Sequence, residues 1–231
     1  MDNREVNTTI DKKSFIITVY RIFIYSLIFT AMTSYAGVRL GIQFSWWWVG
    51  LEILVFITCL VIRDSLFMLY FYASISGLTS APILSKIIGL GQVDIIWKAI
   101  LATIVLFTIL SAYVHLSKRD FSHWRAILFT LLTLLVLSII PLTIFPDRTT
   151  HVVWSLISIF IFSSYVLYDT SDIINRHKPG EEVMAALDLH LDFVNLFWDL
   201  IRIFRRTSSS TTDNLPDDTV DTGVDITADI D

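Results

Sequence analysis

Residues 165–206 read YVLYDTSDIINRHKPGEEVMAALDLHLDFVNLFWDLIRIFRR, and this stretch decides the fold. Its first part closes a long apolar run with an acid, Asp169. Its second part is apolar enough to enter a membrane, yet it carries five polar side chains at spacings of four, three, four and three residues: Asp188, Asp192, Asn195, Asp199 and Arg202. On a helix these five fall within roughly 80° of arc, and we call them the polar seam.

A carboxylate costs at least ~2.5 kcal/mol in a bilayer on insertion scales, so the polar seam should face a bundle interior or water. We therefore expect a central last helix that lines a polar path, with Asp169 facing it from the end of the helix before. Such a seam also suits a surface helix of a soluble protein or a helix lying flat on a membrane. The six apolar segments that precede it argue against both alternatives.

The composition is that of a multi-pass membrane protein. Of the 231 residues, 54% are hydrophobic and 17% are charged, whereas soluble domains carry about 25% charged residues. The net charge of −5 comes from the end of the chain, since residues 207–231 contain seven Asp and no Lys or Arg. The single cysteine, Cys59, excludes an intramolecular disulfide and a cysteine-cluster metal site.

The apolar runs predict an all-α membrane protein of seven transmembrane helices with the last helix central in the bundle. The expected spans are 15–36, 46–62, 65–84, 95–116, 126–145, 152–168 and 183–204. Gly77 and Pro82 predict a kink or break near the end of the third span. A polar, loose segment (1–14) precedes the membrane domain (15–206), and a disordered acidic tail rich in Ser, Thr and Asp (207–231) follows it.

The distribution of Lys and Arg favours a cytoplasmic N-terminus, because the N-terminal segment and the even-numbered loops hold more of them. The basic run between Arg202 and Arg206 argues the other way. A last segment that re-enters the membrane instead of spanning it would return the tail to the cytoplasm.

Asp169 and Asp192 are separated by enough chain for a helix end, a tight loop and a return along the next helix. Two carboxylates brought together in a low dielectric cannot both ionise, so they would share a proton and form a proton-gated latch, or bind a hard cation such as Ca²⁺. Alternatively, Asp169 caps its helix. An intramembrane aspartyl protease would also use two aspartates, and Tyr168-Asp169 fits half of its motif, but no glycines precede Asp192.

Other candidates lie on the second span and the last helix. Glu52 and Arg63 are eleven residues apart, so a continuous helix would place them on one face. Arg63 could clamp the aspartate pair, or it could simply anchor the span at the membrane interface. His190 lies opposite the polar seam and is assigned to packing, and the other histidines show no metal-ligand spacing.

The chain resembles the transmembrane Bax inhibitor motif family, also called the Bax inhibitor-1 family, especially its bacterial members. The resemblance rests on LYDTSDII (167–174), LDLHLDFVNLF (187–197), Gly50-Leu51-Glu52 with Arg63, SISGLTSAPIL (74–84) and LSKRDFS (116–122). It implies seven helices, the last surrounded by the other six, an aspartate pair at Asp169 and Asp192, a latch arginine at Arg63 and a membrane glutamate at Glu52. Asp188 and His190 depart from the residues usual at their positions.

The resemblance implies a pH-sensitive calcium-permeable leak channel rather than an enzyme, with Asp169 and Asp192 as pH sensor and Glu52, Asp188, Asn195 and Asp199 along the polar path. Its partners would be membrane lipid, calcium ions and protons, without cofactor or nucleic acid, and it would act as a monomer in the inner membrane of a bacterial cell. The alternative is a regulatory membrane protein that suppresses cell death or stress by binding partners, with structural aspartates.

Overall fold

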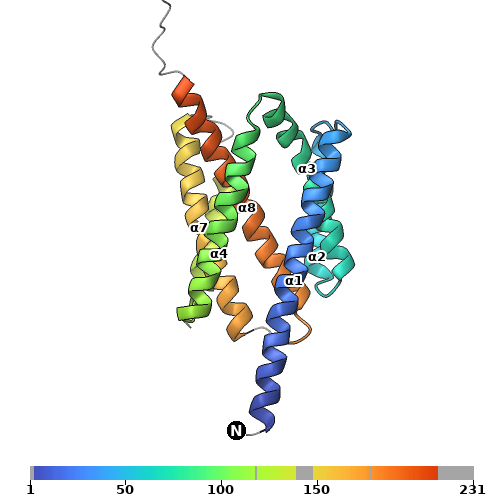
Figure 1. The fold of residues 1–231 in the computed structure, drawn as a ribbon, viewed down its shortest axis with the longest axis vertical. Coiled ribbons are helices and arrows are strands. Elements are labelled where there is room, and N and C mark those ends of the chain that lie inside the picture. Colours follow the sequence, from blue (N-terminus) through green and yellow to red (C-terminus); the bar gives the residue numbers. More distant parts are fainter. Residues whose placement is uncertain (1–2, 118, 139–147, 177, 213–231) are drawn as a thin grey trace, which may run out of the picture.

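The computed structural model describes residues 3–117, 119–138, 148–176 and 178–212, and every regular element in these ranges is helical. Within these ranges, seven α-helices and one short 3-10 helix follow one another. They are α1 (Asn3–Arg39), α2 (Trp46–Val61), α3 (Leu66–Gly89), α4 (Val93–Ser117), η1 (Ser122–Trp124), α5 (Arg125–Leu137), α7 (Arg148–Asn175) and α8 (Glu182–Thr212). The helices form an elongated bundle, in which α1 begins at one end and α8 finishes at the other (Figure 1).

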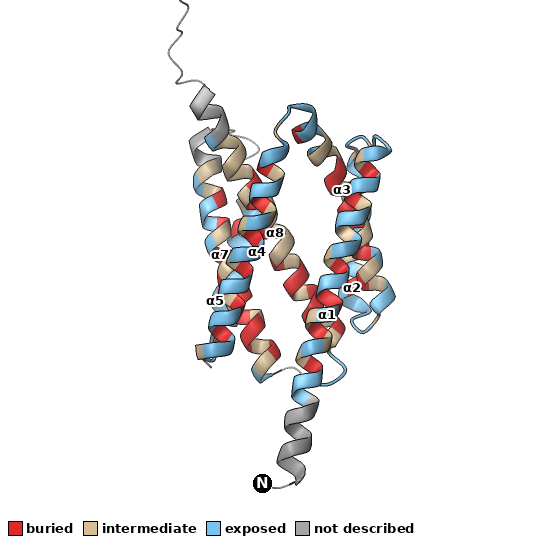
Figure 2. Cartoon of the chain, in the orientation of Figure 1, coloured by how far each residue is buried: buried red, intermediate tan, exposed pale blue. Residues whose placement is uncertain are grey.

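The dimensions of the helices suit a membrane. Four stretches are long and apolar enough to cross one, namely 12–39, 66–89, 93–117 and 152–175, while α2 and α5 are shorter apolar helices. The polar seam keeps α8 out of this group, although its 31 residues extend about 46 Å, longer than the ~30 Å hydrocarbon core. Exposed residues line the outside of the bundle (Figure 2), and many of them have large apolar side chains, as expected for contact with lipid. The protein is therefore a multi-pass membrane protein.

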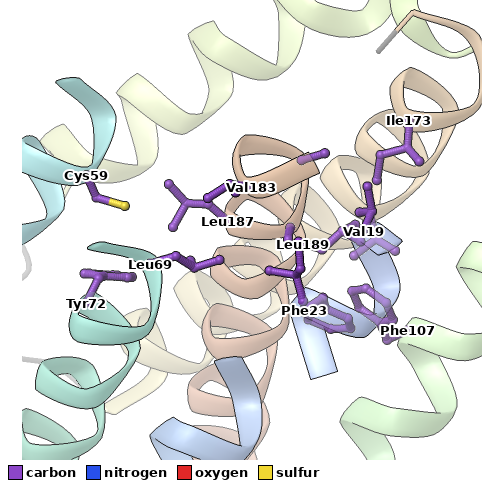
Figure 3. Close-up of a cluster of buried hydrophobic side chains, with 14 of the residues drawn as sticks. Val19, Phe23, Cys59, Leu69, Tyr72, Phe107, Ile173, Val183, Leu187 and Leu189 are labelled. Atoms are coloured by element: carbon purple, nitrogen blue, oxygen red, sulfur yellow. The ribbon is translucent and has the colours of Figure 1, made fainter. Parts of the chain in front are cut away.

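The last helix is central, as predicted. In the described ranges α8 packs against α1, α3, α4 and α7, whereas α2 packs on α3 and α5 packs on α7. Val183, Leu187 and Leu189 of α8 lie among apolar side chains of the neighbouring helices, including Phe23 of α1 and Phe107 of α4 (Figure 3). The rings of Phe23 and Phe107 are stacked at 5.1 Å.

The pairing of α1 with α3 depends on small residues, which let two membrane helices approach closely. A Cβ atom on Gly77 of α3 would collide with Thr33 and with the backbone of Thr30 on α1. The Thr30 hydroxyl donates to the carbonyl of Ala73 at 2.9 Å, and the Ser34 hydroxyl donates to that of Gly77 at 3.0 Å. These bonds fix the register of the two helices.

Several boundaries differ from the sequence prediction. Helix α1 already begins at Asn3, so the N-terminal segment is helical rather than loose. Helix α3 continues through Pro82 without a break, since a proline removes only one backbone donor. Helix α8 continues past Arg206 to Thr212. Part of the fifth span, residues 139–145, and the acidic tail from residue 213 lie outside the described residues.

Candidate functional site

Asp169 and Asp192 meet between α7 and α8. The loop after α7 turns the chain, with Gly180 at a φ of 103°, and α8 returns antiparallel to α7, so that the two aspartates come level. Their side chains are in hydrogen-bonding contact, and that of Asp192 is buried. An ionised carboxylate only accepts hydrogen bonds, so this contact requires one proton between the two groups. The two aspartates that the sequence paired thus lie together, and their role as a pH sensor stays a prediction.

Two further carboxylates act on the pair, and three arginines act on these carboxylates. The charge of Asp188, one turn before Asp192 on α8, acts on both members, and that of Asp172 on α7 acts on Asp169. Asp172 also faces Arg176 at 3.7 Å. The charges of Arg63 and Arg125 act on Asp188. We call Asp169, Asp172, Asp188 and Asp192 the aspartate cluster.

Arg63 takes a different position from the one expected. Helix α2 ends at Val61, so Arg63 lies in the bend beyond it, and the argument that Glu52 and Arg63 share a helical face fails. Its Nε donates to the carbonyl of Leu60 at 2.9 Å, and its side chain is exposed. Among the described residues, Arg63 forms no ion pair with Asp169 or Asp192. Its charge acts on Asp188 instead.

The far end of the polar seam forms a second, separate polar group. The Ser158 hydroxyl of α7 donates to the fully buried Asp199, which also pairs with Arg202 at 2.8 Å. The guanidinium of Arg202 lies 4.7 Å from the ring centre of Trp154. Asp199 is thus neutralised by its own partners, far along α8 from the aspartate cluster. The polar seam is continuous in sequence but forms two sites, because α7 places Asp169 beside Asp192 and Ser158 beside Asp199.

Glu52 and Asn195 line an open cavity of about 730 Å³ between α2, α3 and α8. Glu52 accepts a hydrogen bond from Thr79 at 2.7 Å. Lys86, Arg202 and Arg205 also border the cavity, toward the ends of α3 and α8. Its lining includes Leu191 and Asn195, which flank Asp192 on α8, but neither Asp169 nor Asp192. The cavity therefore lies toward one end of the bundle and does not reach the aspartate pair.

The segment between α4 and α5 also belongs to the site, which the sequence did not indicate. The backbone N–H of Phe121 donates to the Ser171 hydroxyl of α7 at 2.9 Å, and Phe121 is buried. Hydrogen bonds from the side chain and backbone of Ser122 lower the pKa of Asp120. The motif LSKRDFS marks this segment only through the family resemblance, because a short polar sequence ordinarily indicates a solvated loop.

His190 is a packing residue, as predicted. Its side chain is fully buried opposite the polar seam, with Nδ1 at 2.8 Å from the Ser26 hydroxyl and its ring at 6.0 Å from that of Tyr72. The Ser26 hydroxyl already donates to the carbonyl of Phe23. Nδ1 of His190 therefore carries the proton and donates to Ser26.

The described residues contain no group of three or more His, Cys, Asp or Glu side chains that could hold a metal ion. Two carboxylates alone supply fewer oxygens than the six to eight that calcium takes. The contact of Ca²⁺ with Asp169 and Asp192 stays a prediction.

Comparison with known proteins matches residues 12–209 to the family described as inhibitor of apoptosis-promoting Bax1. The chain belongs to this family. The match covers all described helices from the membrane part of α1 to the end of the polar seam, and both aspartates of the pair lie within it. The description of this Bax inhibitor family names an inhibitor and not an enzyme.

Members of the Bax inhibitor family in bacteria, yeast and a virus are similar to this chain. An uncharacterized protein of Helicobacter pylori is 30% identical over 198 residues, which cover 82% of this chain and 85% of that protein. Bax inhibitor 1 of Schizosaccharomyces pombe is 32% identical over 140 residues, 58% of this chain and 50% of that protein. The Golgi anti-apoptotic protein of vaccinia virus is 32% identical over 126 residues, 54% and 53% of the two chains.

Proposed function

We propose that the protein is a pH-sensitive, calcium-permeable leak channel, gated by the proton that Asp169 and Asp192 share. The observation that carries the proposal is the direct contact of these two carboxyl groups between α7 and the central helix α8. A proton shared at a helix–helix contact inside a membrane joins the two helices while it is present. Removing it leaves two like charges in contact.

The rest of the aspartate cluster makes this contact sensitive to pH. Asp172 and Asp188 add negative charge around the pair, so loss of the shared proton is opposed by repulsion on both helices. Separation and hydration of the carboxylates then relieve that repulsion. Each unit of difference between the pKa of the aspartate pair in the closed state and in the open state is worth about 1.4 kcal/mol. A difference of two units therefore changes the ratio of the two states about a hundredfold.

The cavity at Glu52 provides the route for ions in this proposal. Ca²⁺ prefers carboxylate and amide oxygens, and Glu52 and Asn195 present such oxygens at the cavity wall. Opening the contact between α7 and α8 would join the cavity to the aspartate cluster along the polar seam. The protein would act as a monomer in the cell membrane, with its N-terminus in the cytoplasm and calcium and protons as its ligands.

Calcium flux into liposomes that contain the purified protein tests the proposal. Wild type should show a leak that rises with pH between about 6 and 8. Asp169→Asn and Asp192→Asn keep the size of each side chain but remove its titration, so each should flatten this response, and the double variant should differ little from either single one. Asp94→Asn, on the exposed start of α4 beside Lys98, is the matched control and should keep the wild-type midpoint.

A regulatory role through partner binding is the second candidate, favoured by the names of the yeast and viral relatives. In that case the aspartate pair is purely structural. Cell-death suppression that survives Asp192→Asn, together with liposomes whose calcium flux does not depend on Asp192, would support this candidate and reject the channel.

A further inference from the structure

The cavity at Glu52 is a groove that follows one face of α3 and one face of α8. The lining residues of α3 recur every three or four positions, as on one side of a helix: Ser76, Thr79, Ser80, Ile83 and Lys86. On α8 the lining also keeps to one face, from Leu191 to Arg205. This distance is about 21 Å along the helix axis, longer than one ~15 Å leaflet of a membrane core.

Three cations border the outer end of the groove, and we call them the basic mouth: Lys86 of α3 and Arg202 and Arg205 of α8. Ile87 of α3 and Ile201 of α8 belong to one buried apolar cluster. The residues next to them, Lys86 and Arg202, therefore lie on adjoining helix turns. Asp199 pairs with Arg202, but among the described residues no carboxylate pairs with Lys86. The basic mouth thus keeps uncompensated positive charge.

The basic mouth lies at the level of the membrane surface. Glu52 of α2 accepts a hydrogen bond from Thr79 of α3 at 2.7 Å, which fixes the relative height of these two antiparallel helices. Trp46 precedes Glu52 by six residues and Lys86 follows Thr79 by seven, so both lie about 10 Å further toward the same end. Trp46 and Trp47 are 78% and 87% exposed, as is usual for tryptophans among lipid headgroups. Lys86 is therefore at headgroup level, and Glu52 lies deeper.

The groove also opens toward the outside of the bundle. Helices α2 and α8 both line it, yet in the described ranges the main partner of α2 is α3, and α8 packs on α1, α3, α4 and α7. Phe44 and Ile83 line the groove and are also 56% and 41% exposed. Apolar side chains thus lead from the basic mouth to the surface that faces lipid.

We propose that this groove binds one anionic phospholipid, with its phosphate at the basic mouth and one acyl chain along Phe44, Ile83 and Trp198. Arginine binds phosphate through paired hydrogen bonds and lysine binds it as a point charge, and basic pockets between membrane helices suit such headgroups. The carboxylate of Glu52, about 10 Å deeper, is further from the phosphate than the three cations are. The site goes beyond the proposed channel and is compatible with it, since a bound headgroup lowers the positive charge that Ca²⁺ meets at the basic mouth.

Native mass spectrometry of the full chain in detergent tests the headgroup contact. The ligands are phosphatidylglycerol, phosphatidylcholine with the same acyl chains, and soluble glycerol phosphate. The variants are Lys86→Gln, Arg205→Gln and their combination, with Lys86→Arg and Arg205→Lys to keep the charge. Lys98→Gln is the matched control, because it removes a lysine from the exposed start of α4, at the same end of the bundle but outside the groove.

Wild type should bind phosphatidylglycerol about tenfold more tightly than phosphatidylcholine, because only the former carries net negative charge. Lys86→Gln and Arg205→Gln should each weaken phosphatidylglycerol binding about fivefold, and their combination about 25-fold. The charge-keeping variants and Lys98→Gln should bind it like wild type. Equal affinities for the two lipids in wild type, an equal loss in Lys98→Gln, or glycerol phosphate that binds as tightly as phosphatidylglycerol would overturn the inference.

Fluorescence locates the acyl chain. Phosphatidylglycerol with brominated acyl chains quenches tryptophan emission, and the part of the quenching due to Trp198 is identified by its loss in Trp198→Phe. This part should be larger than with brominated phosphatidylcholine, and it should fall in the double glutamine variant. Quenching without any contribution from Trp198 would show that the lipid does not occupy the groove.

Neither measurement uses ion flux, so the lipid site and the proposed channel are tested separately. A wild type without calcium flux that still prefers phosphatidylglycerol would reject the channel and retain the lipid site. A pH-dependent calcium leak in a protein without this preference would do the reverse.

Discussion

Asp120 lies in the segment between α4 and α5 and accepts a hydrogen bond from Ser171 of α7. The hydrogen bonds that lower its pKa, from the Ser122 side chain and backbone, favour its ionised form in the folded state. A carboxyl whose pKa is lowered by folding stabilises the protein above its ordinary pKa of about 3.9, and this stability is lost as the pH falls through the lowered value. Neutral pH therefore gives the full contribution.

We predict that Asp120→Asn lowers the thermal unfolding midpoint in detergent at pH 7, and that the difference from wild type shrinks below about pH 4. Ser171→Ala removes the hydroxyl that joins the same segment to α7, but it removes no titrating group. Because this hydroxyl also donates to Asp120, part of its deficit should shrink in acid, but the part due to the lost acceptor for the Phe121 N–H should stay constant with pH. Equal pH profiles for the two variants would show that the charge of Asp120 is irrelevant.

Single residues also show how far the sequence could predict the site. The aspartate pair can be predicted from the sequence, because the four-three spacing on one helix and an acid at the end of a span are both local patterns. The position of Arg63 was not, since it depends on α2 ending at Val61. The contact of Phe121 with Ser171 gave no signal either, because the two residues are fifty positions apart in the chain.

Among the helices, the contact between α1 and α3 leaves the least room for substitution. Gly77→Ala would bring its Cβ into Thr33 and the Thr30 carbonyl, and backbone atoms cannot move aside as a flexible side chain can. We predict a loss of about 1–3 kcal/mol in the free energy of unfolding, measured by denaturant titration in detergent micelles. Loss of register would also weaken the bond from Ser34.

Gly50→Ala is the matched control, because Gly50 lies inside α2 with no atom near its missing Cβ. Replacing an interior helical glycine by alanine there should stabilise by about 0.5–1 kcal/mol. Equal destabilisation by both substitutions would indicate that close packing at Gly77 is not the cause.

At the level of elements, the spans were predictable because lipid-facing helices require long apolar runs. The residues at which the helices begin and end were harder to predict. Hydropathy cannot register that α1 extends into a polar sequence at Asn3, or that α8 continues to Thr212, since a helix outside the membrane needs no apolar face. Pro82 suggested a break that the surrounding helix does not show.

For the whole molecule, the family match ends at residue 209, shortly before the Asp-rich end of the chain. That end has no apolar run with which to offset the entropy of ordering. We predict that deletion of residues 213–231 leaves membrane insertion, the unfolding midpoint and the leak in liposomes unchanged. A misfolded or silent deletion variant would show that the tail contributes to the membrane domain.

The one-sided opening of the cavity at Glu52 has an electrical consequence. A membrane potential falls mainly across the part of a protein that water does not enter, so a polar cavity that reaches Leu191 and Asn195 concentrates the field on the remaining part of the bundle. A proton that reaches the aspartate pair from the other face then crosses a larger share of the voltage. Half of a 100 mV potential is worth about 1.2 kcal/mol per charge. The leak would consequently respond to voltage as well as to pH, with opposite sign in vesicles of opposite protein orientation.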